Sequence, residues 1–214
     1  MRRVARLALS SCVLLGLLAA APAVGQSDTH RRLAFSMDSD IHRIDLDGRN
    51  LRNLTERRDR DGSPSWSPDG RQIVFASSRG DGVPVGVFVM KASGKDIRLL
   101  SRHASGDNLP SWSPNGKTIA FVSNREGNDE IHVMDADGGN VRRLTDHSEP
   151  DRQPAWSPDG STIAFASWRE GNVEVYAMDT DGGALRNLTN DPGWDSQPAW
   201  SPDGSHIAFV SWRE

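Results

Sequence analysis

A short sequence recurs four times along the chain and constrains the fold more than any other feature. It reads Pro-x-Trp-Ser-Pro-(Asp/Asn)-Gly, and consecutive copies lie 46, 44 and 44 residues apart. The four tryptophans are Trp66, Trp112, Trp156 and Trp200. A regular period of this length indicates a stack of similar units with a shared core, because one such unit cannot bury its apolar residues alone.

Each unit predicts four short strands, which we call A to D in chain order. The tryptophan strand A precedes an apolar strand B (Ile163-Ala164-Phe165), an apolar strand C (173–178) and a closing strand D that ends at Leu188-Thr189. Ser-Pro-Asp-Gly and Asp-x-Asp-Gly suit the tight turns between strands. Strands B and C are apolar on both faces, as in sheets packed between two neighbours. We therefore predict an all-β fold with β-propeller architecture, about four blades and no helix beyond the amino-terminal segment.

The predicted array is incomplete at both ends. Its strand count is four A, five B, four C and four D strands, in units at about 33–55 (partial), 64–101, 110–145, 154–189 and 198–214 (partial). Either the last A strand joins the first B, C and D strands in one closing blade, or the propeller is an open arc. An open arc exposes strand edges that favour self-association. A truncated fragment of a larger propeller protein is a further alternative.

The first 25 residues have the layout of a secretory signal peptide. Arg2, Arg3 and Arg6 precede an apolar run over 7–21, and small residues follow it. We predict cleavage between Ala23 and Gln26, repeats over 26–214 and a periplasmic or secreted protein with no membrane insertion after cleavage. The single cysteine, Cys12, lies in the segment that is removed, so the mature chain is predicted to contain no disulfide.

The Pro-x-Trp-Ser-Pro-Asp-Gly, Ile-Ala-Phe and Met-Asp-x-Asp-Gly-Gly sequences resemble the TolB-type β-propeller repeat, over about residues 33–214. The resemblance implies the propeller fold. It implies no single function, because such repeats occur in periplasmic scaffolds, peptidase-associated propellers and some polysaccharide lyases. TolB also carries an α/β domain ahead of its propeller, for which residues 26–32 leave no room.

One polar position recurs with the tryptophans. An aspartate stands five residues before each of them, and we expect all four in the D-to-A loops at one rim of the central channel: Asp61, Asp107, Asp151 and Asp195. As a ring they would bind a cation or a basic peptide. The alternative is that each pairs with an arginine of its own B-to-C loop: Arg79, Arg125, Arg169 or Arg213. Trp168, Trp194 and Trp212 are predicted near the same face, where exposed aromatics suit a peptide or a sugar.

Catalytic motifs are absent from the sequence. It contains no Gly-x-Ser-x-Gly elbow, phosphate-binding glycine loop or His-x-x-x-His pair. The Asp-x-Asp-Gly segments are interpreted as turns rather than calcium loops, because Lys91-Ala92-Ser93-Gly94 takes the same place without a carboxylate. A net charge of −4 without a basic cluster argues against nucleic acid as a partner.

The sequence therefore predicts an exported, non-catalytic scaffold that binds a protein or peptide partner and needs no metal or cofactor. The alternative from another class is a lyase-like carbohydrate-active enzyme with a metal at the channel mouth.

Overall fold

The computed structural model describes residues 32–56, 59–80 and 84–213. The predicted signal peptide over 1–25 and its cleavage region at 23–26 lie outside these residues. The described residues form seventeen strands and no helix, which confirms the all-β prediction. Within these ranges, accordingly, there is no apolar helix of the length needed to cross a membrane.

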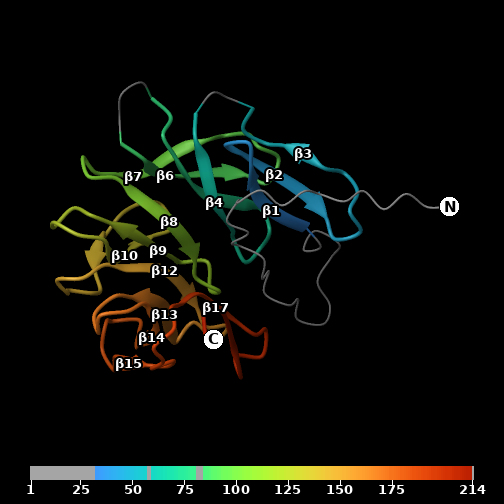
Figure 1. Ribbon diagram of the computed structural model, residues 1–214. Coiled ribbons are helices and arrows are strands. Elements are labelled where there is room, and N and C mark those ends of the chain that lie inside the picture. Colours follow the sequence, from blue (N-terminus) through green and yellow to red (C-terminus); the bar gives the residue numbers. More distant parts are fainter. Residues whose placement is uncertain (1–31, 57–58, 81–83, 214) are drawn as a thin grey trace.

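The strands form five antiparallel sheets that follow one another along the chain (Figure 1). The two end sheets are β1 (Arg32–Met37), β2 (Asp40–Asp45) and β3 (Arg52–Asn53), and β16 (Asp195–Trp200) with β17 (Ile207–Ser211). The second sheet is β4 (Asp61–Trp66), β5 (Gln72–Ser77), β6 (Gly86–Lys91) and β7 (Arg98–Arg102). The third is β8 (Asp107–Trp112), β9 (Thr118–Ser123), β10 (Glu130–Asp135) and β11 (Arg142–Arg143). The fourth is β12 (Asp151–Trp156), β13 (Thr162–Ser167), β14 (Glu174–Asp179) and β15 (Arg186–Asn187).

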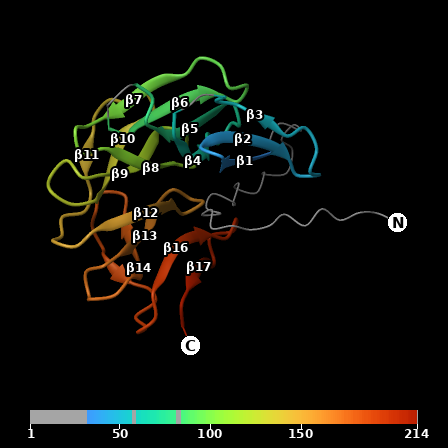
Figure 2. The same ribbon diagram turned by 45° about the horizontal axis from the view of Figure 1, so that its top comes forward.

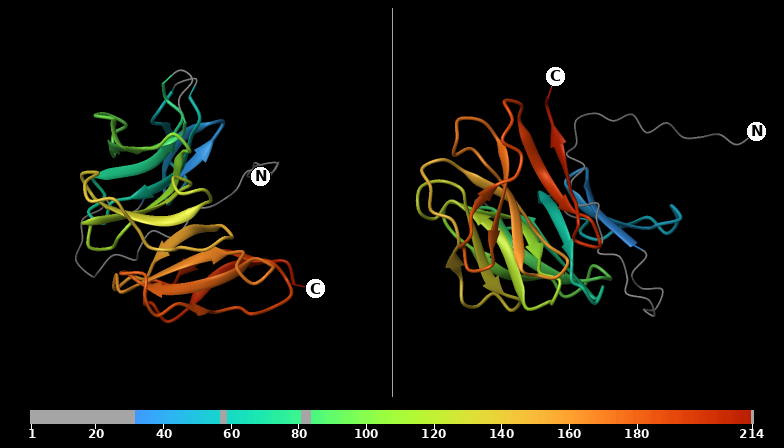
Figure 3. Two further views of the ribbon diagram at one scale, coloured as in Figure 1. Left: turned by 90° about the vertical axis from the view of Figure 1, so that its left-hand side faces the viewer. Right: turned by 90° about the horizontal axis from the view of Figure 1, so that it is seen from below.

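Each sheet is one propeller blade, and the blades are arranged in an arc. Strand A of each blade contacts strand A of the next, from β4 through β8 and β12 to β16. Figure 2 shows the arc from the first sheet to the last, and the side views of Figure 3 show consecutive sheets as layers. Among the described strands β16 pairs with β17 alone, and none joins the first sheet to the last. The described propeller is therefore open, and no mixed blade closes it.

The hydrophobic core consists of three clusters, each held between two consecutive blades. In β9, Ile119 and Phe121 pack toward blade 2, whereas Ala120 and Val122 pack toward blade 4. The same pattern joins Ile73 and the rest of its cluster to blade 1. Both faces of a blade are thus buried by its neighbours, which explains why strands B and C are apolar without alternation.

Repeated contacts also lock the outer ends of neighbouring blades together. In blades 2 to 4 a glycine in the C-to-D turn has a positive φ, and a Cβ on it would lie 2.7 Å from a leucine carbonyl oxygen of the preceding blade. The three pairs are Gly94 with Leu54, Gly138 with Leu100, and Gly182 with Leu144. An arginine of the preceding blade donates to a carbonyl of the same turn: Arg43 to Ala92, Arg98 to Asp137 and Arg142 to Thr180, at 2.9, 3.2 and 2.9 Å. Each of these three C-to-D hairpins is therefore fixed by contacts with the blade before it.

The repeated tryptophans pack between blades, as the sequence predicted. Trp112 is 8% exposed and belongs to the cluster between blades 2 and 3. Trp156 packs against the next cluster, and its Nε1–H donates to the Ser111 carbonyl of the preceding blade at 3.1 Å. Trp200 repeats this bond to Ala155 at 3.1 Å.

We predict that Trp156→Ala lowers the free energy of unfolding by about 3 kcal/mol, because it leaves a cavity and removes a bond between blades. Asp159→Ala, in an exposed turn beside the same strand, should cost about 1 kcal/mol or less. Thermal or urea unfolding of the two variants measures the difference. Equal losses would show that Trp156 does not join the blades.

Candidate functional site

The four aspartates of the predicted ring lie in strands, not in the D-to-A loops where we expected them. Each is the first residue of its strand A, in β4, β8, β12 and β16. The reason is a bulge within each strand, at a residue of positive φ directly before the proline: Ser63, Leu109, Gln153 and Gln197, at 51, 48, 59 and 59°. Proline has no N–H for the ladder. Pairing resumes beyond the bulge, where Asp151 faces Ser167.

Each aspartate is buried and held by the arginine of its own blade. The aspartates are 3, 0, 0 and 0% exposed, in chain order. The arginine-to-carboxylate distances are 2.9 Å (Arg79–Asp61), 3.1 Å (Arg125–Asp107), 2.6 Å (Arg169–Asp151) and 2.5 Å (Arg213–Asp195). The predicted alternative of arginine pairing is therefore confirmed for all four.

Two further groups complete this arrangement at the end of each sheet. The Arg125 guanidinium lies 5.5 Å from the centre of the Phe121 ring, and its Nε donates to Ser123 Oγ at 2.9 Å. The other blades repeat the aromatic contact at 5.2 Å (Arg79–Phe75), 5.6 Å (Arg169–Phe165) and 5.4 Å (Arg213–Phe209). The arginine thus covers the aromatic residue of strand B while it neutralises the aspartate of strand A.

The carboxyl groups differ in pKa according to their surroundings. Burial raises the pKa of Asp151 above its ordinary value, although Ser167 and Arg169 oppose this effect. Burial also acts to raise the pKa of Asp195, but the hydrogen bonds from Arg213 and Ser211 outweigh it, and the pKa is lowered. The geometry gives the four aspartates a role within their own blades, and cation binding by the ring stays a prediction.

The Asp-x-Asp-Gly carboxylates are likewise occupied by their own turns. Asp137 Oδ1 accepts from Gly139 N at 2.9 Å, and Asp135 Oδ2 accepts from Asn140 Nδ2 at 2.6 Å. The part of the chain that the structure describes brings no three histidine, cysteine, aspartate or glutamate residues together in an arrangement suited to a metal ion.

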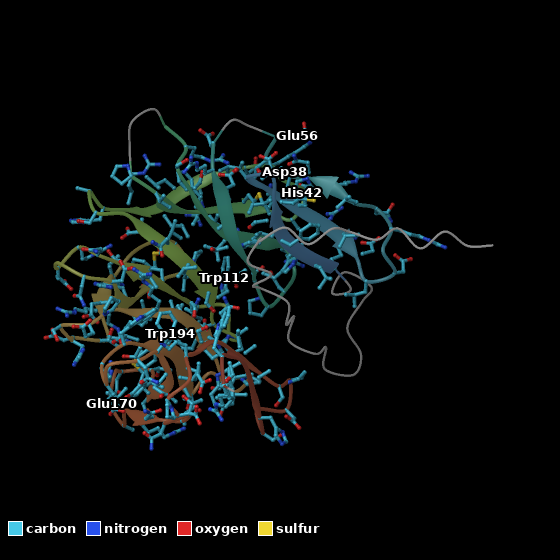
Figure 4. All side chains as sticks on the ribbon, viewed as in Figure 1. Asp38, His42, Glu56, Trp112, Glu170 and Trp194 are labelled. Carbon is cyan, nitrogen blue, oxygen red and sulfur yellow. The ribbon has the colours of Figure 1, made fainter. Side chains whose placement is uncertain are left out.

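The most accessible aromatic residues flank the last sheet: Trp194 directly precedes β16, and Trp212 directly follows β17. Trp194 and Trp212 are 59 and 75% exposed, and with Pro192 and Gly193 they line a hollow of about 370 Å³. A second hollow of about 520 Å³ also reaches Pro192 and is lined by Glu170, Gly171, Asn172, Glu174, Asn190 and Asp191. In Figure 4, Trp194 and Glu170 lie on the part of the molecule opposite the first sheet, where Asp38 and His42 are labelled. We call the residues that line the two hollows the tryptophan site.

Hydrogen bonds fix the loop that carries the tryptophan site. Asn172 Nδ2 donates to the Asp191 carbonyl at 2.6 Å, and Asp191 Oδ1 accepts from Gly193 N at 2.9 Å. Trp212 N donates to the Trp194 carbonyl at 3.0 Å, which brings two of the three predicted tryptophans together. Trp168 is not part of the site: the Arg152 guanidinium covers its ring at 5.5 Å.

Two buried glutamates that were not predicted from the sequence organise this end of the blades. Glu130 and Glu174 begin their C strands at 0 and 2% exposure. They accept from Thr145 and Thr189 hydroxyls at the end of strand D, and from the backbone N–H of His147 and Asp191. A Glu that recurs at the start of strand C, together with a Leu-Thr that recurs after strand D, is a readable signal. Blade 2 obscured it, because it has Gly86 and Ser101 at these places.

A family model described as the Tricorn protease N-terminal beta propeller domain matches residues 127–214. The TolB of Acinetobacter baumannii is similar with a TM-score of 0.77 and 27% identity, over 86% of this chain and 48% of that one. A TolB structure from Agrobacterium tumefaciens has a TM-score of 0.72 and 26% identity, over 86% of this chain and 72% of that one. The chain is a TolB-like β-propeller protein.

The TolB-like chain also shares its fold with an enzyme. An oligogalacturonate lyase in complex with manganese has a TM-score of 0.64 at 19% identity, over 83% of this chain and 55% of that one, a level that shows the fold alone. No curated protein matches the chain in sequence. The TolB-like chain spans about half the length of the Acinetobacter baumannii protein.

We predict that Asp107→Asn in this TolB-like chain lowers the free energy of unfolding by about 1–3 kcal/mol, because Arg125 loses its charged partner in a buried position. Asp137→Asn, in an exposed turn, is the matched control and should change stability little. Urea unfolding compares the two, and calorimetric titration with Mn²⁺ shows whether either variant changes cation binding. Unchanged stability together with loss of Mn²⁺ binding in Asp107→Asn would instead support the acidic ring.

Proposed function

We propose that this chain is an exported, non-catalytic β-propeller scaffold that binds a protein or peptide partner at the tryptophan site. The exposure of Trp194 and Trp212 around one hollow carries the proposal. Large aromatic side chains that stay exposed beside each other mark interaction surfaces, because a partner removes much apolar area from water when it covers them.

The chemistry of the tryptophan site favours a peptide with an apolar or aromatic side chain beside a basic group. Trp194, Trp212 and Pro192 offer stiff apolar surface, which loses little side-chain entropy on binding. Glu170 lies at the neighbouring hollow and is exposed, so it can accept hydrogen bonds from a lysine, an arginine or a backbone N–H. The structural likeness to TolB agrees with a scaffold.

The lyase-like alternative has less support from the same residues. Proton abstraction requires a carboxylate or another base free to reach a substrate. At this site Glu174 accepts from Thr189, and Asp191 is paired with Arg213 at 3.5 Å. The third carboxylate, Glu170, is exposed but accepts from Asn187 Nδ2 at 3.0 Å. All three groups thus have structural partners already, which supports binding over catalysis.

Export rests on the arrangement of arginines, apolar run and small residues in 1–25. Expression in a bacterium with a periplasm, followed by amino-terminal sequencing of the periplasmic fraction, tests it. We expect a mature chain that begins at Val24, Gly25 or Gln26. An intact amino terminus in the cytoplasm would contradict export.

Peptide binding is tested by selection from a random peptide library displayed on phage, with the purified mature chain as target. We expect the selected peptides to bind Trp194→Ala and Trp212→Ala at least about ten-fold more weakly than the unchanged chain, a loss of about 1.4 kcal/mol. Trp168→Ala is the matched control, because Trp168 occupies the repeat position of Trp212 but lies outside the site. Peptides that bind all three variants equally would contradict the proposal.

A further inference from the structure

The interface between consecutive blades is built three times within the described residues, and its outer half is left open a fourth time. Three leucines that end strand D pack against the next interface: Leu54, Leu100 and Leu144. The glycine of the following C-to-D turn closes on each of their carbonyl groups. Leu188 is the fourth member of this set, and no described turn covers it, so it is 40% exposed.

Arg186, like Leu188, is not contacted by any described C-to-D turn. Its counterparts Arg98 and Arg142 each donate to a carbonyl of the next C-to-D turn, at 3.2 and 2.9 Å. The Arg186 side chain is exposed, and no hydrogen bond or ion pair joins it to any described residue. Arg186 and Leu188 therefore occupy the positions at which the corresponding residues of blades 2 and 3 contact the C-to-D hairpin of the next blade.

The edge of β17 completes this surface. Ile207–Ser211 has the same sequence, Ile-Ala-Phe-Val-Ser, as residues 119–123 of β9. β9 is covered by strand C on one edge and by blades on both faces, and Phe121 and Val122 are fully buried. In β17 only β16 pairs with the strand, and Phe209 and Val210 are 37 and 43% exposed. The same five residues thus present an edge for which β10 shows the matching partner.

We propose that β17, Arg186 and Leu188 form a docking surface for a β-hairpin with the sequence pattern of strands C and D of this chain. The established interface between blades continues across this surface, and it specifies the occupant: an apolar strand of the Glu-Ile-x-Val-Met-Asp type, then an Asp-x-Asp-Gly turn. By the pairing of β9 with β10, Ile131 of such a hairpin lies opposite Val210, Val133 opposite Ala208 and Met134 opposite Ile207. The turn glycine then meets the Leu188 carbonyl, and Arg186 donates to the turn.

This surface shares no residue with the tryptophan site, and its occupant is recognised by main-chain pairing rather than by exposed aromatic rings. The hairpin therefore identifies the partner as a repeat of the same kind as these blades. Failure of this docking proposal can be distinguished from failure of the proposed function, because neither Arg186 nor Leu188 lines the tryptophan site.

The test uses a synthetic peptide with the sequence of residues 130–145, added to the purified chain. We expect one peptide to bind per chain and to raise the melting temperature, whereas a scrambled peptide of the same composition has no effect. Arg186→Gln and Leu188→Asp should each weaken binding at least about ten-fold. Leu185→Asp is the matched control: Leu185 is also exposed, but its counterpart Ile97 packs toward the preceding blade, so affinity should be unchanged.

A second arm avoids a peptide that fails to form a hairpin in solution. The sequence of residues 127–145 is joined directly after Glu214, where it restores the Arg-Glu-Gly-Asn order of the complete repeats. We expect this extended chain to melt higher than one extended with the scrambled sequence. Absence of an effect in both arms, or a stable dimer of the unextended chain in which a second copy protects 207–211, would overturn the proposal.

Discussion

Each inner sheet buries both of its faces against its neighbours, and the rest of the architecture follows from that packing. A four-stranded blade whose B and C strands are apolar on both faces is not stable in water by itself. The favourable free energy of folding comes from the two interfaces that it shares with its neighbours. Phe121 illustrates the point: it lies in its own sheet but is buried against the sheet before it. Stability in such a chain is therefore distributed over interfaces, and the blade at an open end is the weakest.

The Asp–Arg pairs solve a related problem at the end of each sheet. A buried carboxylate is costly unless it is paired, and Asp107 is fully buried. The bulge before each proline allows strand A to reach this aspartate, and the arginine of the B-to-C loop supplies the counter-charge while it covers an aromatic ring. The bulge, the Asp–Arg pair and the contact between arginine and aromatic ring thus occur together in each blade that has a strand A. The exposed tryptophans beside β16 and β17 take no part in this repeated arrangement, and for that reason they support binding.

Much of this arrangement could be predicted from the sequence, because the repeats report the same local structure several times. The strand count, the inter-blade tryptophans and the pairing of aspartate with arginine all followed from position in the repeat. The placement of the aspartates failed, since proline was interpreted as the start of strand A. A bulge at Ser63, Leu109, Gln153 or Gln197 needs a positive φ that those residue types do not announce. The network around Glu130 and Glu174 was also missed, because its members lie more than ten residues apart and blade 2 lacks them. The hollows beside Pro192 depend on how two loops meet, which the repeat pattern does not encode.

Amide hydrogen exchange of two segments with identical sequence tests whether each sheet owes its stability to its neighbours. Residues 119–123 and 207–211 have the same sequence, so their intrinsic exchange chemistry is closely matched, and only their neighbours differ. If the adjoining strand C and the neighbouring blades supply the stability, the amides of Phe121 and Val122 exchange at least about a hundredfold more slowly than those of Phe209 and Val210. Equal protection in the two segments would contradict the account, because it would mean that each sheet is stable without the blades on either side.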